Sequence, residues 1–155
     1  MIRQGRRFAL DFGSARIGIA VCDREGILAV PVATLSNNEE AISAFLGLID
    51  GDVLEIYVGL PLNLSGERTQ STNNALNFAR TLSQLIQIPV RLIDERLTTS
   101  QANHQLREVG KSQKQGRGSI DQMAAVAILE YALNMERNTG KPPGIEIKEW
   151  LEEND

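Results

Sequence analysis

Asp11 lies where an acid is unusual, inside the apolar stretch FALDFGSARIGIAV. An ionised carboxylate within a strand is unfavourable unless something pairs with it. Alternation places Asp11 on the same face as Ala9 and Gly13, opposite the larger apolar side chains. Small neighbours predict open space above the carboxylate, which is typical of an acid that faces a metal ion or a phosphate. The alternative is an acid at a strand end that accepts hydrogen bonds from turn amides.

A second pair of acids, Asp94 and Glu95, follows the buried strand VRLID. The carboxyl ends of strands in open α/β sheets are where ligands bind. Adjacent residues point to opposite faces, so at most one of the two is expected to share the face of Asp11. The alternative for either acid is pairing with Arg96 or capping a helix at Thr98.

Asp121 begins the helical pattern IDQMAAVAILEYALN. At 100° per residue it aligns with Ala124, Ala125 and Ile128, so it is expected to face the core from the first turn of the helix. The alternative is an acid that complements the helix dipole. Carboxylates without Cys or His partners suit magnesium or manganese. Two such ions about 4 Å apart can activate a water and stabilise the leaving oxygen of a phosphodiester.

The elements that must position these acids follow from hydrophobic periodicity and turn residues. Three strands come first, with Pro31 in the third predicting an edge position or a bulge. Helices and strands then alternate, which predicts an α/β fold with a mixed five-stranded sheet, an antiparallel three-strand meander followed by parallel strands, flanked by helices. The expected strands cover 7–13, 16–23, 27–35, 53–61 and 90–94; the expected helices cover 39–50, 69–88, 98–106 and 119–135, with a mobile loop at 111–118.

The bulk properties fit a single soluble domain. The 155 residues are expected to form one folded domain over 1–138 and an acidic C-terminal tail over 139–155. Net charge is -4, and residues 146–155 account for it with five acids and one lysine. No apolar run is long enough to span a bilayer, no signal peptide is evident, and a single cysteine excludes an internal disulfide. These properties predict a cytoplasmic protein with no membrane partner.

Four separated motifs, LDFGSARIGIAV, VGLPLNLSGERT, DERLTT and SIDQMAAVAILEYAL, resemble the YqgF family in order and spacing. Members of this family are described as Holliday junction resolvases and as nucleases acting on pre-16S ribosomal RNA. The resemblance covers about residues 6–135. It implies a ribonuclease-H-like fold, a bacterial cytoplasmic protein and metal-dependent cleavage of phosphodiester bonds.

Residue by residue, the resemblance implies that Asp11, Glu95 and Asp121 bind magnesium or manganese, with Asp94 as the alternative to Glu95. Resolvase relatives carry a further acid where this chain has Ala124. The basic residues expected to contact nucleic acid are Arg16 and Arg96 at the scissile phosphate, and Lys111, Lys114 and Arg117 on the backbone.

The sequence leaves the substrate open between structured RNA, including ribosomal precursor particles, and branched DNA. It also leaves open a monomer or a homodimer. Two other functional classes are considered. One is a non-catalytic nucleic-acid or ribosome-assembly factor. The other is an ATPase domain, because ATPase domains also begin with a D-x-G motif followed by a strand. The ATPases need two such domains, and 155 residues supply one.

Overall fold

The structure is a computed structural model that describes residues 2–98 and 114–154, with the backbone alone for 114–119. A six-stranded sheet has the order β3-β2-β1-β4-β5-β6. Its strands are β1 (Arg7–Phe12), β2 (Arg16–Cys22), β3 (Ala29–Ser36), β4 (Glu55–Leu60), β5 (Val90–Asp94) and β6 (Ile145–Glu146). The first three form an antiparallel meander, and β1, β4 and β5 are parallel.

The α/β class, the meander and the parallel strands confirm the prediction, but five strands is wrong. The sixth strand, β6, pairs antiparallel with β5 over two residues, which is too short to leave a periodic signal. Pro31 lies in β3, which is an edge strand, and the β2–β3 register shifts beside it between Ile19 and Ala20. Both features expected of Pro31 are therefore present.

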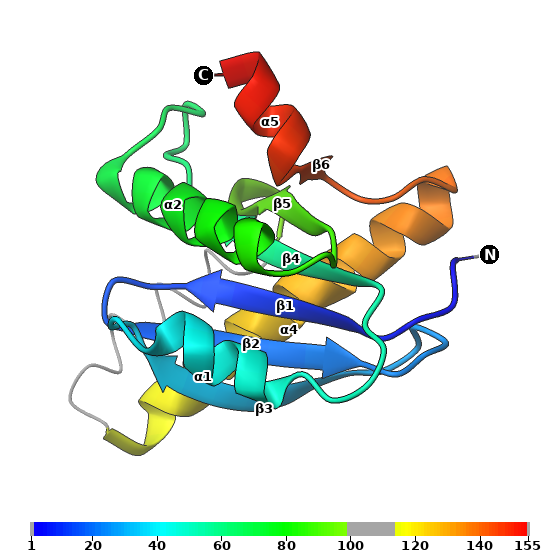
Figure 1. Cartoon of the computed structure of the whole chain (residues 1–155), viewed down its shortest axis with the longest axis horizontal. Coiled ribbons are helices and arrows are strands. Elements are labelled where there is room, and N and C mark those ends of the chain that lie inside the picture. The colour runs from blue at the N-terminus through cyan, green and yellow to red at the C-terminus, as the bar shows by residue number, and fades with distance from the viewer. Residues whose placement is uncertain (1, 99–113, 155) are drawn as a thin grey trace.

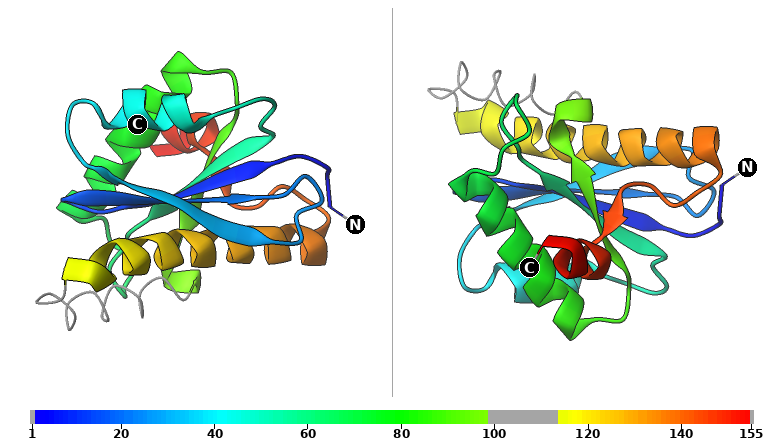
Figure 2. Two further views of the ribbon diagram at one scale, coloured as in Figure 1. Left: turned by 90° about the horizontal axis from the view of Figure 1, so that it is seen from below. Right: turned by 90° about the horizontal axis from the view of Figure 1, so that it is seen from above.

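Helices cover the two faces of the sheet unequally (Figures 1 and 2). One face carries α1 (Ala41–Leu48), α2 (Gln70–Leu85) and α5 (Ile147–Asn154), and the other carries the long helix α4 (Lys114–Thr139). Phe8 and Leu10 of β1 belong to the core under α1 and α2, whereas Ala9 belongs to the core under α4. The predicted alternation of β1 is therefore confirmed.

Helix α4 begins at Lys114, five residues before the predicted start. Lys114 and Arg117 thus belong to a helix and not to a loop, and Asp121 lies two turns in and not in the first turn. The loop was predicted because of Gly116 and Gly118. Each glycine destabilises a helix by only about 1 kcal/mol relative to alanine, and extension of a well-packed helix can offset that loss. The expected helix over 98–106 and Lys111 lie outside the described residues, except for Thr98.

The acidic C-terminal segment, expected as a tail, packs on the sheet. Ile147 at the start of α5 is fully buried, and Trp150 and Leu151 pack against the core under α1 and α2. Gly144 allows the approach, since a Cβ there would collide with the backbone carbonyl of Leu92. Burial of three large side chains explains why this charged segment folds back.

Ion pairs hold the N-terminal segment against the end of the sheet at which β1 begins. Arg3 Nη2 lies 2.7 Å from Glu136 Oε1 and 2.7 Å from Glu55 Oε1. Arg7, fully buried, reaches Glu136 Oε2 at 3.1 Å. Burial raises the pKa of the Glu136 carboxyl, but hydrogen bonds from Arg3 and the charges of both arginines outweigh it and leave the pKa below its usual range.

Candidate active site

Asp11 is flanked by glycine on both neighbouring strands. On one side it pairs directly with Gly18 of β2. On the other side Leu10 pairs with Val58, so Asp11 lies beside Gly59 of β4. Laterally paired residues share a face of a sheet, and this row lies on the face that α4 covers. Two residues without side chains therefore leave room on either side of the Asp11 carboxylate.

Helix α4 occupies the space above Gly18. A Cβ built on Gly18 would lie 2.5 Å from the carbonyl carbon of Asp121 and 3.1 Å from the amide nitrogen of Gln122. The backbone of α4 thus rests directly on β2, and this contact brings Asp121 beside the strand that carries Asp11. The Asp121 side chain is 1% exposed, and Arg16 Nε donates a hydrogen bond to its Oδ2 at 2.7 Å.

The Glu95 side chain occupies the space above Gly59. A Cβ on Gly59 would lie 2.7 Å from Glu95 Oε1 and 2.6 Å from Ile128 Cδ1 of α4. Glu95 opens the 3-10 turn η1 (Glu95–Leu97), and its side chain lies on the Asp11 face between sheet and helix. The two glycines thus admit Asp121 from one side of Asp11 and Glu95 from the other.

Asp94 has a different position. Its carboxylate caps η1 by accepting from the Arg96 amide, and Arg96 Nη2 lies 2.6 Å from its Oδ2. Its side chain is half-buried and lines a cavity that includes none of the other three acids. Pairing with Arg96 was the alternative offered by the sequence for this acid. Of the two neighbours, it is Glu95 that the structure brings to the face of Asp11.

The acid row is closed over, which corrects the open space expected above Asp11. Exposure is 0% for Asp11, 3% for Glu95 and 1% for Asp121. The cause is the alanine stripe of α4: Ala124 and Ala125 are fully buried and let the helix lie close on the sheet. None of the three carboxylates is without a partner in the fold.

The donor set fits a hard cation in kind, because it consists of carboxylates alone and the flanking glycines let Asp121 and Glu95 come close to Asp11. In the described conformation the acids are not gathered around an ion. Within 2–98 and 114–154, no three His, Cys, Asp or Glu side chains are arranged to hold a metal. Arg16 instead places a positive charge on Asp121, at an oxygen that a cation would use.

The basic residues predicted to contact nucleic acid are divided by the structure. Arg16 and Arg96 are each about one-third exposed and ion-paired with an acid of this region. Lys114 and Arg117 lie in the first turns of α4, where only the backbone is described. Lys111 is outside the described residues. The sequence analysis gave no role to Arg68 and Trp150. Their side chains stack, with Arg68 Cζ 5.0 Å from the centroid of the Trp150 ring.

The sheet is mixed and starts with an antiparallel meander, and buried acids lie on its first strand, directly after β5 and on the last long helix. This arrangement defines the class of ribonuclease-H-like enzymes, which hydrolyse phosphodiester bonds. The family model RuvX, described as Holliday junction resolvase, matches residues 5–135. The chain belongs to this family, and it is a nuclease.

Relatives of known description span nearly the whole chain. A protein of Clavibacter michiganensis subsp. michiganensis is 44% identical, covering 92% of this chain and 91% of its own length. One of Streptomyces coelicolor is 44% identical, with 92% and 88% covered. One of Mycobacteroides abscessus is 45% identical, with 88% and 86% covered. Each carries the description "Putative pre-16S rRNA nuclease". No helix among the described residues has the length and apolar character needed to cross a membrane.

Proposed function

We propose that this protein is a cytoplasmic, metal-dependent nuclease that processes the 5′ end of pre-16S ribosomal RNA within ribosomal precursor particles. Asp11, Glu95 and Asp121 would hold magnesium or manganese. The observation that carries the proposal is the glycine-flanked row, in which three buried carboxylates from β1, η1 and α4 share one face of the sheet. Each acid has a partner in this fold, but three carboxylates buried on one face repel one another, and a divalent cation is the charge that would best offset this repulsion.

The chain's own residues divide the work. The bound ion supplies the activation of a water and the stabilisation of the leaving oxygen. Arg16 neutralises Asp121, and with a cation held at Asp121 its partly exposed guanidinium would be available to a phosphate oxygen of the substrate. Asp94 fixes the orientation of Arg96 by a bidentate contact, so Arg96 presents its remaining donors to the substrate backbone. The start of α4, with Lys114 and Arg117, and Lys111 before it would add backbone contacts.

The RNA substrate rests on the descriptions of the relatives. A four-way DNA junction is the second candidate, and the description of the family favours it. A non-catalytic assembly factor is disfavoured by the retention of all three acids, because such a protein would gain nothing from burying them.

Asp11→Asn tests the proposal. The substitution keeps the shape of the side chain and removes one of three neighbouring negative charges, so cleavage should be lost while the free energy of unfolding stays equal or rises. Cleavage of a pre-16S RNA fragment and of a four-way DNA junction is measured with magnesium, with manganese and with a chelator. Asp52→Asn, an exposed acid outside the site, is the matched control.

Cleavage by the parent should need the metal and should survive in the control. Parental rates in purified Asp11→Asn, or cleavage that the chelator leaves unchanged, would show that the acid row is not the reaction centre. Preference for the junction over the RNA would instead assign the activity to branched DNA.

A further inference from the structure

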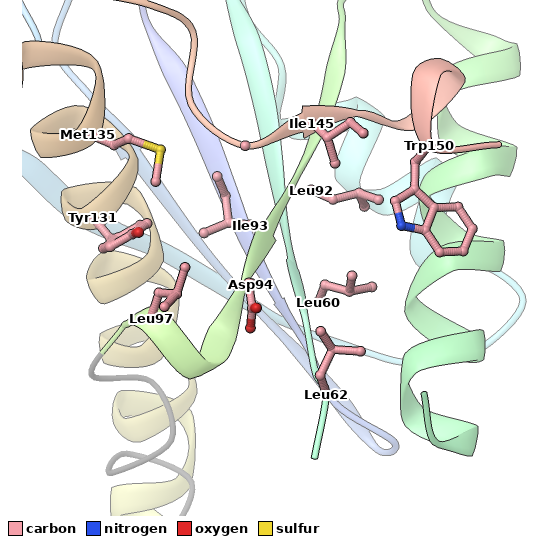
Figure 3. A pocket seen from close by; sticks show the side chains of 11 residues that line it. Leu60, Leu62, Leu92, Ile93, Asp94, Leu97, Tyr131, Met135, Ile145 and Trp150 are labelled. Carbon is pink, nitrogen blue, oxygen red and sulfur yellow. The ribbon is translucent and has the colours of Figure 1, made fainter. Parts of the chain in front are cut away.

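A cavity of about 210 Å³ lies at the carboxyl ends of β4 and β5, between α4 and α5 (Figure 3). Tyr131 of α4 and Leu97 stand on one side, Trp150 of α5 on the other, and Asp94 between them. The cavity is smaller than the roughly 300–1,000 Å³ pockets that take drug-sized ligands. It therefore suits a single planar ring system.

The lining is mostly apolar, and its one charged side chain is the carboxylate of Asp94. Arg96 holds that carboxylate in place, with Nε 3.1 Å from Oδ1 and Nη2 2.6 Å from Oδ2. Three donors of Arg96, its backbone amide, Nε and Nη2, bind this carboxylate, so about one of its roughly four acceptor sites remains for a ligand. A flat apolar body that carries an N–H donor matches this lining.

The rim beside this cavity is basic. Leu62 of the lining pairs with Arg68 across a short turn, and Arg68 stacks on Trp150. Gly66 of the same turn lies against Arg96, since a Cβ there would be 3.0 Å from Arg96 Nη1. One turn thus brings two guanidinium groups, those of Arg68 and Arg96, to the rim of the cavity.

We propose that this cavity binds an unpaired nucleobase of the substrate strand, with Asp94 accepting from an exocyclic amino group. The inference rests on the proposed nuclease function. Bases of single strands stack on aromatic side chains, and a carboxylate is the natural acceptor for the amino group of cytosine. Asp94 directly precedes Glu95, about 3.8 Å away between Cα atoms. A base held by Asp94 and a phosphate held by Arg96, which contacts Asp94, can belong to one stretch of strand.

Trp150 makes the test direct, because it is the only tryptophan of the chain and it lines the cavity. Its fluorescence is followed in the full-length protein during titration with cytidine, uridine and deoxycytidine 5′-monophosphates and with ribose 5-phosphate. Cytidine monophosphate should give a saturable change at about tenfold lower concentration than uridine monophosphate, which lacks the amino group. Ribose 5-phosphate should give none.

Three variants sharpen the result. Tyr131→Ala should weaken cytidine monophosphate binding by about tenfold, because a stacked base loses its partner. Met123→Ala, which removes an exposed side chain of the same helix outside the cavity, should leave binding unchanged. Asp94→Ala should abolish the preference for cytidine over uridine. Equal affinity for deoxycytidine monophosphate would assign recognition to the base alone, and lower affinity would add the 2′-hydroxyl; both support a base site.

The absence of a saturable change with any monophosphate, or an equal response to ribose 5-phosphate, would overturn the proposal. A weaker response in Met123→Ala equal to that in Tyr131→Ala would do the same. The outcome is separable from the nuclease proposal, because Asp11→Asn should lose cleavage and keep the fluorescence response. If the cavity binds no base, Asp11-dependent cleavage still persists; if the chain does not cleave, the fluorescence response still reports the base.

Discussion

Gly18→Ala probes the contact that brings α4 to the strand carrying Asp11. The added Cβ would lie 2.5 Å from the carbonyl carbon of Asp121, where two carbon atoms normally approach to about 3.5 Å or more. The shortfall is about 1 Å. The obstacle is backbone and not the end of a flexible side chain, so rotamer changes cannot relieve it. The helix must move away from β2, and Asp121 moves with it.

The expected consequences have two magnitudes. Overpacking of this kind costs about 1–3 kcal/mol, and a backbone obstacle places Gly18→Ala at the upper end. A displacement of about 1 Å at a reacting centre can lower the rate by about 100-fold. Activity should therefore fall by much more than the loss of folded protein explains, since a domain of ordinary stability stays folded after losing 3 kcal/mol.

The assay compares kcat/KM for RNA cleavage with the free energy of unfolding from urea denaturation. Gly47→Ala is the matched control: Gly47 lies inside α1 with nothing within 4 Å of its Cβ position, so alanine there should stabilise by about 0.5–1 kcal/mol and leave cleavage unchanged. If Gly18→Ala cleaves within about threefold of the parent, close packing of α4 on β2 does not position the acid, and the reasoning fails.

Two further predictions follow from ion pairs. Arg16→Gln removes the guanidinium that pairs with the Asp121 carboxylate, so calorimetry should show manganese binding several-fold more tightly, a gain on the order of 1 kcal/mol for a partly exposed pair. The control Arg24→Gln, at an exposed arginine, should leave manganese binding unchanged. Weaker manganese binding in Arg16→Gln would show that Arg16 and the ion do not compete for Asp121. Glu136 has a lowered pKa in the folded state, so its contribution to stability is present above the ordinary glutamate pKa of about 4.3 and is lost as pH falls through the folded value. Glu136→Gln should lower the free energy of unfolding at pH 7 and reduce the further loss of stability below about pH 4.3, as measured by urea unfolding. Glu130→Gln, at an exposed glutamate, should do neither. If Glu136→Gln leaves the dependence of stability on acid pH unchanged, Glu136 does not link protonation to unfolding.

Much of the fold was readable because local patterns and tertiary packing agree. Strict alternation in β1 fixed which face carries Asp11, and the alanine spacing of α4 fixed which face carries Asp121. Pro31 indicated an edge strand or a bulge because proline has no backbone N–H to donate to a hydrogen-bond ladder between strands. These signals work from the sequence alone since each is a property of one element.

Other features depend on contacts between elements and left no local signal. The closing of α4 over Asp11 could not be predicted, because it depends on how near a helix lies to a sheet. Strand alternation alone did not separate Glu95 from Asp94, and only the family resemblance favoured Glu95; the 3-10 turn that follows β5 is what places its side chain on the Asp11 face. The strand β6 has two residues and exists only because β5 offers an edge. Trp150 sits in a charged segment whose composition alone suggests solvent, and its position was missed for that reason.

The distance in sequence between the interacting acids and bases has a consequence for the unfinished protein. Arg16 and Asp121 are 105 positions apart and meet only when α4 docks on a completed meander. The acid row therefore does not exist in a nascent or partly melted chain, even one whose first strands are paired. On the proposed role of the acid row, competence to cut nucleic acid and completion of the fold would be reached together, so a half-folded chain would not cut.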